Sequence, residues 1–195
     1  MAFLFEVIFR SIVPPFYSFS LIEKLCKKKL ERYPNHHEAI WLLSNLYVWY
    51  GRKYNEAKKL LESLVISGID RRADRLLLAR VYYKLKLHQK VVEILLKKDT
   101  LEDKDMENFF IGNSLVELDN HADAIRYLQK YLAYHRTRDY LVFTRLGYAY
   151  YIEGLYDHAL NAYQNAKRLN PSEKGIIDNI NLCIEKQKSK ESVFH

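Results

Sequence analysis

The chain is poor in residues that interrupt or cross-link a fold, with only 4 prolines, 6 glycines and 2 cysteines among 195 residues. No segment has the composition of a disordered linker or a strand-rich domain, and 49% hydrophobic residues suffice for one continuous core. The sequence also lacks a glycine-rich phosphate loop, a nucleophile elbow and a paired-cysteine motif. The three missing motifs are the usual sequence signatures of nucleotide-binding, hydrolytic and redox enzymes, so the sequence does not indicate any of these enzyme classes.

The histidines give no support for a metal site. The chain has seven, and none stands in a ligand arrangement such as two histidines one helical turn apart around a glutamate. His36 and His37 adjoin Pro34 in a connection between expected helices, where a structural or solvated role is expected. We therefore expect no metal ion, no cofactor and no enzymatic activity.

What the sequence does contain is a small residue that recurs at the interval of one helical hairpin. It appears at intervals of 35, 33 and 35 residues, as Ser44, Ala79, Gly112 and Gly147. A second small position recurs at intervals of 34, 33 and 35 residues, as Ala57, Val91, Ala124 and Ala159. Larger side chains at a helix crossing would push the helix axes beyond the roughly 8 to 10 Å of ordinary packing. The two markers therefore predict a stack of paired helices.

The clearest copy lies in residues 140–173, where the apolar, glycine, aromatic and proline positions of a known repeat are all filled. They are Phe143, Leu146, Gly147, Tyr150, Gly154, Tyr156, Ala159, Tyr163, Ala166 and Pro171. This stretch resembles the tetratricopeptide repeat. The resemblance implies an all-α fold, a right-handed α-solenoid of antiparallel helix hairpins with a C-terminal capping helix. Other copies depart from the repeat, since Lys86 and Asp119 stand where a turn glycine is usual, and repeat one carries an extra residue near Gly51.

The same phasing divides the whole chain. The expected segments are an apolar segment at 1–17, the second helix of an incomplete repeat at 18–36, four repeats at 37–71, 72–104, 105–139 and 140–173, a capping helix at 174–190 and a tail at 191–195. Cys26 and Cys183 lie near opposite ends of this array, whereas a disulfide needs Cα atoms within about 7 Å. Both cysteines should be free, which favours a reducing compartment, and we expect a cytoplasmic protein.

The net charge of +7 is unevenly distributed. Residues 51–98 carry 13 basic and 5 acidic residues, whereas residues 99–195 carry 12 basic and 15 acidic residues. Such a basic excess attracts nucleic acids. Here the basic side chains, among them Lys58, Lys59 and Lys90, fall on second helices and connections and form no stripe with base-stacking aromatics. A solvated convex face explains them, and we do not expect a nucleic-acid partner.

The resemblance also indicates where a partner would bind. In this family the first helix of each hairpin lines a concave groove that holds an extended peptide or a partner helix. The groove residues expected here are Trp41, Asn45, Trp49, Arg80, Tyr83, Lys84, Phe109, Asn113, Tyr148 and Tyr151. Tryptophan, tyrosine and arginine are residue types in which binding energy concentrates. The alternative role for the aromatic members is packing between neighbouring hairpins.

The first thirteen residues are apolar almost all round, and two prolines follow them. As a helix they span only about 20 Å, too short for the roughly 30 Å hydrocarbon core of a membrane. They also lack the basic region and cleavage site of a signal peptide. The candidate contact residues of this segment are Phe3, Leu4, Phe5, Ile8, Phe9 and Ile12. Three interpretations remain: the first helix of the incomplete hairpin, an interfacial membrane anchor, or a segment inserted into another protein or a second copy of the chain.

These features predict a noncatalytic scaffold or adaptor that binds a peptide or helix of a partner protein in its groove. The alternative is a membrane-associated assembly factor, or a self-assembling scaffold, that is tethered through the apolar N-terminal segment. The sequence leaves the identity of the partner and the oligomeric state open.

Overall fold

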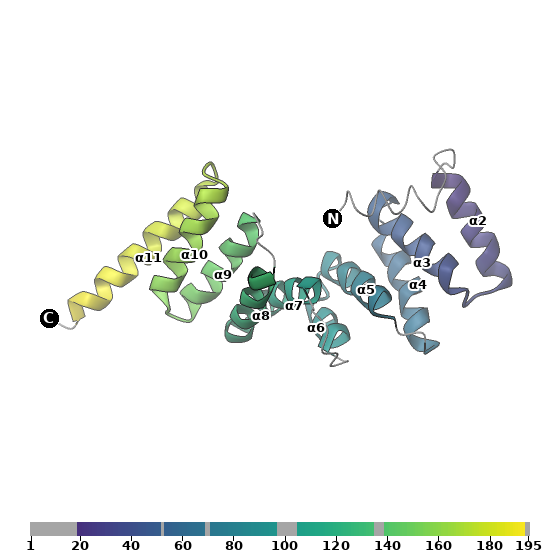
Figure 1. The fold of residues 1–195 in the computed structure, drawn as a ribbon, viewed down its shortest axis with the longest axis horizontal. Helices are drawn as coiled ribbons and strands as arrows, with labels where there is room; N and C mark the ends of the chain where they lie inside the picture. The colour runs from purple at the N-terminus through teal and green to yellow at the C-terminus, as the bar shows by residue number, and fades with distance from the viewer. Residues whose placement is uncertain (1–18, 52, 69–70, 97–104, 135–138, 194–195) are drawn as a thin grey trace. The chain divides into compact units, whose positions relative to one another are not determined.

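The protein is described from a computed structural model, which describes residues 19–51, 53–68, 71–96, 105–134 and 139–193. Every regular element in these ranges is helical (Figure 1), so the all-α fold class expected from the sequence is confirmed. The chain divides into two compact units, Met1–Leu85 and Lys86–His195. The boundary falls in the turn inside the second expected repeat.

The first unit has four α-helices and one π-helical turn in its described part. They are α2 (Phe19–Arg32), α3 (His37–Leu46), η1 (Tyr47–Gly51), α4 (Tyr54–Ile66) and α5 (Arg72–Lys84). Each α-helix packs against the next one along the chain. The core between them is aliphatic, and its fully buried side chains include Ile40, Leu46, Leu61, Leu64 and Leu78.

The second unit continues the same pattern in its described residues. Its helices are α6 (His88–Leu96), α7 (Asp105–Glu117), α8 (His121–Tyr134), α9 (Tyr140–Ile152), α10 (Tyr156–Leu169) and α11 (Lys174–Val193). Here too each helix packs against the next, and α7 also contacts α9. The helix expected to cap the array, α11, packs on α10 through the buried Ile176 and Cys183 and continues three residues beyond the expected end at 190.

All eight small marker residues are buried, as helix crossings require. The two glycines among them lie so close to the partner helix that a side chain would collide with it. A Cβ atom added at Gly112 would lie 2.8 Å from Cγ and Cδ2 of Leu128, and one at Gly147 would lie 2.9 Å from two ring carbons of Tyr163. The small residues therefore set the spacing of α7 against α8 and of α9 against α10.

The turns without glycine keep the backbone geometry of the turn that has one. Gly154 has φ of +71°, and Lys86 and Asp119 adopt φ of 61° and 59°. The Asn120 N–H donates to the Leu115 carbonyl at 2.9 Å, and the Leu155 N–H donates to the carbonyl five residues earlier at the same distance. These bonds end both helices in the same left-handed cap. Lys86 and Asp119 therefore hold a conformation that disfavours residues with a Cβ atom.

The extra residue of repeat one is absorbed by η1. In the other three repeats the two small markers are 12 residues apart, but Ser44 and Ala57 are 13 apart. The helix accommodates the additional residue by widening into one π-helical turn, and the Lys53 N–H donates to the Tyr47 carbonyl at 3.1 Å where it ends. Such single wide turns are often found at functional sites. This one carries Trp49.

A charged cluster ties α2 to the wide turn. Glu23 Oε1 accepts hydrogen bonds from Tyr47 Oη at 2.9 Å and Lys53 Nζ at 3.2 Å, and it pairs with Lys27 Nζ at 2.8 Å. These donors, Lys27 foremost, lower the pKa of Glu23 from its ordinary 4.5 to about 2. The incomplete repeat expected at 18–36 is thereby fixed to repeat one by a carboxylate that stays ionised.

The apolar segment 1–17, with its contact residues Phe3, Leu4, Phe5, Ile8, Phe9 and Ile12, lies outside the described residues. Within the ranges that the structure describes, no helix is long and apolar enough to cross a membrane. Cys26 and Cys183 are both free and buried. Burial raises the pKa of each thiol.

Candidate partner-binding surface

The wide turn and α5 bring an aromatic ring and a cation together in the first unit. The guanidinium carbon of Arg80 lies 4.5 Å from the centre of the Trp49 ring, which is cation–π distance. Both side chains are half-buried, and burial lowers the pKa of Arg80 from its ordinary value. This stacking orients the guanidinium of Arg80 on α5 against the ring of Trp49 in η1. Tyr83 on the next turn of α5 is half-buried, and Lys84 is exposed.

The two asparagines expected in the groove are buried. Asn45 is 4% exposed and Asn113 is 2% exposed. Each donates its side-chain N–H to the carbonyl four residues earlier in its own helix, Trp41 O at 2.8 Å and Phe109 O at 2.7 Å. One N–H of each amide is thus engaged within its own helix, as short polar side chains often are.

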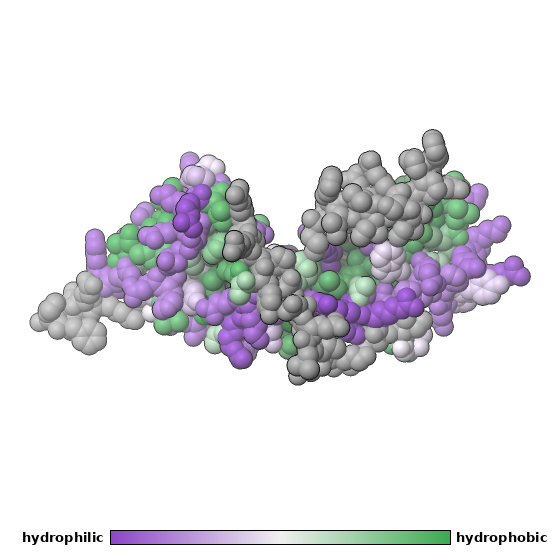
Figure 2. Space-filling view, in the orientation of Figure 1, coloured by the Kyte–Doolittle hydropathy of each residue, from purple (hydrophilic) through white to green (hydrophobic). Residues whose placement is uncertain are grey.

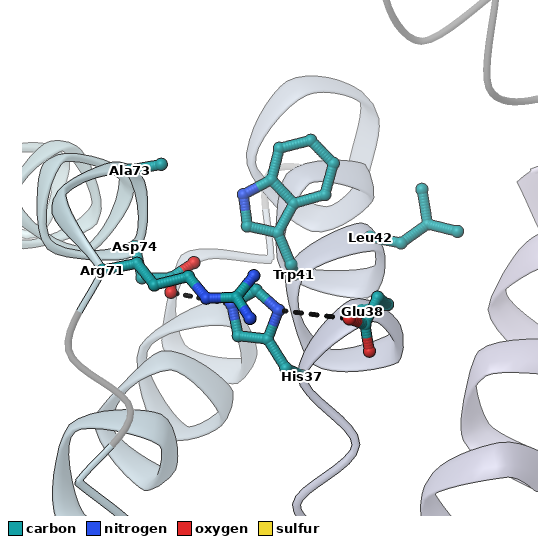
Figure 3. A pocket seen from close by; sticks show the side chains of 7 residues that line it. All are labelled: His37, Glu38, Trp41, Leu42, Arg71, Ala73 and Asp74. Atoms are coloured by element: carbon teal, nitrogen blue, oxygen red, sulfur yellow. Dashed lines mark hydrogen bonds and ion pairs between the residues drawn. The ribbon is translucent and has the colours of Figure 1, made fainter.

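A pocket of about 400 Å³ opens between the N-terminal turns of α3 and α5 (Figure 3). Its lining consists of His37, Glu38, Trp41, Leu42, Arg71, Ala73 and Asp74. His37 Nε2 and Asp74 Oδ2 lie 2.8 Å apart and join the two helices across its floor. Of the expected groove residues, only Trp41 belongs to this lining. Nothing in the sequence pattern indicated the pairing of His37 with Asp74.

In the second unit, α9 presents an exposed apolar stripe. Leu141, Tyr148 and Ile152 are 55%, 43% and 48% exposed, and their spacing with Arg145 places all four on one face of the helix. Figure 2 shows apolar surface in green over the part of the molecule that carries α9, α10 and α11. We refer to these four residues as the α9 stripe.

The α9 stripe borders a second pocket, of about 520 Å³, between α7, α9 and α11. At its edge Arg145 donates to Glu117 Oε1 at 2.6 Å, and this hydrogen bond lowers the pKa of Glu117. Both side chains of the ion pair are about one third exposed. The surface thus combines apolar area with one oriented ion pair, a composition that suits recognition of a protein segment.

The remaining groove residues of this unit take part in aromatic packing. Phe109 is half-buried, and its ring centre lies 5.3 Å from those of Phe110 and Tyr131. Tyr151 is half-buried against Tyr156 at 5.5 Å. Tyr148 reaches the surface, while one side of its ring contacts that of His121 at 5.5 Å. Of these aromatics, Tyr148 is the most open to a partner.

Within the described ranges, no group of three or more His, Cys, Asp or Glu side chains is placed so that it could hold a metal ion. The lining of the pocket that holds the His37–Asp74 pair contains no serine, threonine, cysteine or lysine.

Comparison with known proteins agrees with this architecture. The sequence model of the tetratricopeptide repeat matches residues 141–173. No curated protein matches the chain. Among solved structures, YrrB, described as a tetratricopeptide-repeat protein with an unusual peptide-binding site, is similar with a TM-score of 0.73 and 18% identity over 91% of this chain and 87% of its own.

Two structures of MamA are also similar. One has a TM-score of 0.65 at 19% identity, covering 76% of this chain and 81% of MamA, and the other has 0.61 at 22% identity, covering 73% and 82%. At such identities the likeness shows a shared fold. Residues 141–173 thus match the tetratricopeptide repeat by sequence, and the chain shares the fold of tetratricopeptide-repeat proteins such as YrrB.

Proposed function

We propose that the protein is a noncatalytic scaffold that binds a peptide or helix of a partner protein on the exposed faces of its first helices. The observation that carries this proposal is the α9 stripe. Three large apolar side chains on one face of this helix are each more than two fifths exposed, whereas Val142, Leu146 and Tyr150 of the same helix are buried.

The α9 stripe is suited to docking because its long side chains project from one face of the helix and together form a continuous strip of contact surface. A partner segment laid along α9 would cover Leu141, Tyr148 and Ile152 and would meet the Arg145–Glu117 pair at its centre. Burial of apolar area supplies the affinity, and the ion pair supplies orientation. The peptide-binding site of the similar protein YrrB supports the class of ligand.

The proposal is tested by crosslinking capture from the native cell, read by mass spectrometry. The stripe variant carries Leu141→Ser, Tyr148→Ala and Ile152→Ser. The control carries Ile66→Ser, which removes an apolar side chain that is 86% exposed on α4. We expect the stripe variant to lose the proteins that the unchanged protein and the control both capture, with the helical circular dichroism signal retained in all three.

Capture of the same proteins by the stripe variant and the control would refute the proposal. A second variant, Tyr83→Ala, extends the test to the first unit, since Tyr83 lies one turn from Arg80 on α5. Loss of capture in this variant with an unchanged melting temperature would place that helix in the binding surface too. Loss of the fold would instead assign Tyr83 to the core.

A further inference from the structure

The pocket between α3 and α5 contains a buried carboxylate of which only one oxygen is hydrogen-bonded. Asp74 is 2% exposed, and its Oδ2 atom pairs with His37 Nε2. Its Oδ1 atom has no hydrogen-bond partner among the described residues. A buried acceptor without a donor is costly, and such groups are rare in folded proteins. A donor group that enters the pocket from outside would satisfy this atom.

The opposite wall of this pocket offers a donor. Figure 3 shows the indole nitrogen of Trp41 turned toward α5, the helix that carries Asp74. Within the described part of the chain, the Trp41 N–H makes no hydrogen bond. An indole nitrogen can only donate. The pocket thus presents an acceptor, Asp74 Oδ1, and a donor, the Trp41 N–H, on facing helices. His37 Nδ1 is a further buried atom without a hydrogen bond among the described residues, and Leu42 and Ala73 are apolar lining.

The charges around the pocket favour an uncharged ligand group. Glu38 and Asp74 contribute two carboxylates to the lining, and Arg71 and the ionisable His37 contribute the basic groups. Neither sign is in large excess, so a cation or an anion would meet repulsion from one of these groups. A neutral group that both donates and accepts fits the pair formed by Asp74 and Trp41.

We infer that this pocket binds the side-chain carboxamide of a glutamine or asparagine of the partner. The amide N–H₂ donates to Asp74 Oδ1, and its carbonyl accepts from the Trp41 indole N–H. A peptide group has the same two functions but carries a Cα atom on either side. A primary carboxamide ends its side chain and can therefore reach an acceptor that is buried. This inference rests on the proposed function in assigning the carboxamide to a partner protein.

The test uses butyramide, which reproduces the end of a glutamine side chain, with methyl propyl ketone and butyrate as comparison probes. The ketone replaces the amide nitrogen by a methyl group, and butyrate replaces it by a charged oxygen. Saturation-transfer NMR on the full chain gives the Kd of each probe. We expect butyramide to bind about tenfold more tightly than either comparison probe, because only butyramide provides the donor that Asp74 lacks.

Matched variants locate the binding. Trp41→Phe and Trp49→Phe each remove one of the two indoles, but only Trp41 lines the pocket. We expect Trp41→Phe and Asp74→Leu to weaken butyramide binding about tenfold and Trp49→Phe to leave it unchanged. Asp74→Asn, which can keep an oxygen toward the pocket, should retain most of the binding. Thermal melts exclude loss of fold.

Equal binding of butyramide and the ketone would overturn the inference, as would equal effects of the two tryptophan variants or no saturation transfer from any probe. None of these outcomes bears on the α9 stripe. Partner capture by the Trp41→Phe variant, which keeps the stripe intact, therefore tests the pocket separately from the stripe. Unchanged capture by the stripe variant would refute only the proposal for the second unit. Failure of the probes concerns only this pocket.

Discussion

Replacing Gly147 by leucine tests the helix crossing on which the repeat assignment depends. A Cβ atom at this position would lie 2.9 Å from Cδ1 and Cε1 of Tyr163, well inside the roughly 3.5 to 4.0 Å of an ordinary carbon contact. Tyr163 is 2% exposed, so its ring has no open space to move into. The three further carbons of leucine would have to displace α10.

Two effects oppose each other in this variant. Overpacking a core costs about 1 to 3 kcal/mol, and leucine should fall toward the upper end because its first carbon already collides. Leucine is the better helix former, which returns less than about 1 kcal/mol. We therefore expect a net loss of about 1 to 2 kcal/mol and a fall in Tm of about 2 to 8 °C.

Gly175→Leu is the matched control. This glycine lies in the first turn of α11, and a Cβ atom there would meet only Glu173 Oε1 at 3.8 Å. The same substitution should leave Tm unchanged or raise it slightly through helix propensity. Thermal and denaturant unfolding followed by circular dichroism compare the two. If Gly147→Leu melts no lower than Gly175→Leu, packing does not require the glycine and the crossing is misassigned.

Three further predictions concern the turns and the charged cluster. Asp119→Gly should raise the free energy of unfolding by about 0.5 to 1 kcal/mol, and Gly154→Ala should lower it by a similar amount, since both sites have positive φ. A fall for Asp119→Gly and a rise for Gly154→Ala in urea unfolding would refute the backbone strain. Glu23→Gln should lower stability at pH 7, and because the folded pKa is depressed from 4.5 to about 2, its deficit should shrink as pH falls from about 5 toward 2. A deficit that stays constant over that range would argue against the cluster. Deleting Tyr50 from η1 should restore the 12-residue spacing and keep the fold, whereas deleting Lys84 from α5 should rotate the following residues and lower Tm further; equal losses would mean that the wide turn is not an insertion.

The repeat could be predicted from the sequence because its markers obey a local rule. A helix crossing demands a small residue wherever it occurs, so Ser44, Ala79, Gly112 and Gly147 carry the period and all four are buried. The turn at Asp119 follows from the same phase, and the structure shows that the backbone keeps the left-handed cap without glycine. Spacing alone is enough for such features because each depends on one residue and its immediate neighbours.

The pairing of His37 with Asp74 depended on tertiary structure. The two residues are 37 positions apart, and they occupy different places in their repeats. No period connects them. They meet because the N-terminal turns of α3 and α5 lie side by side. This arrangement depends on α4, which follows α3 in the sequence and packs against both α3 and α5.

Exposure was also decided by tertiary structure, as four residues in one repeat position show. Asn45, Arg80, Asn113 and Tyr148 each follow the small crossing residue directly, and the sequence places all four in the groove. The asparagines are 4% and 2% exposed and bond to their own helices, whereas Arg80 extends to the ring of Trp49 and Tyr148 is 43% exposed. The sequence determined where each residue stands along its helix. The length of the side chain and the neighbour that covers it decided whether a partner could touch it.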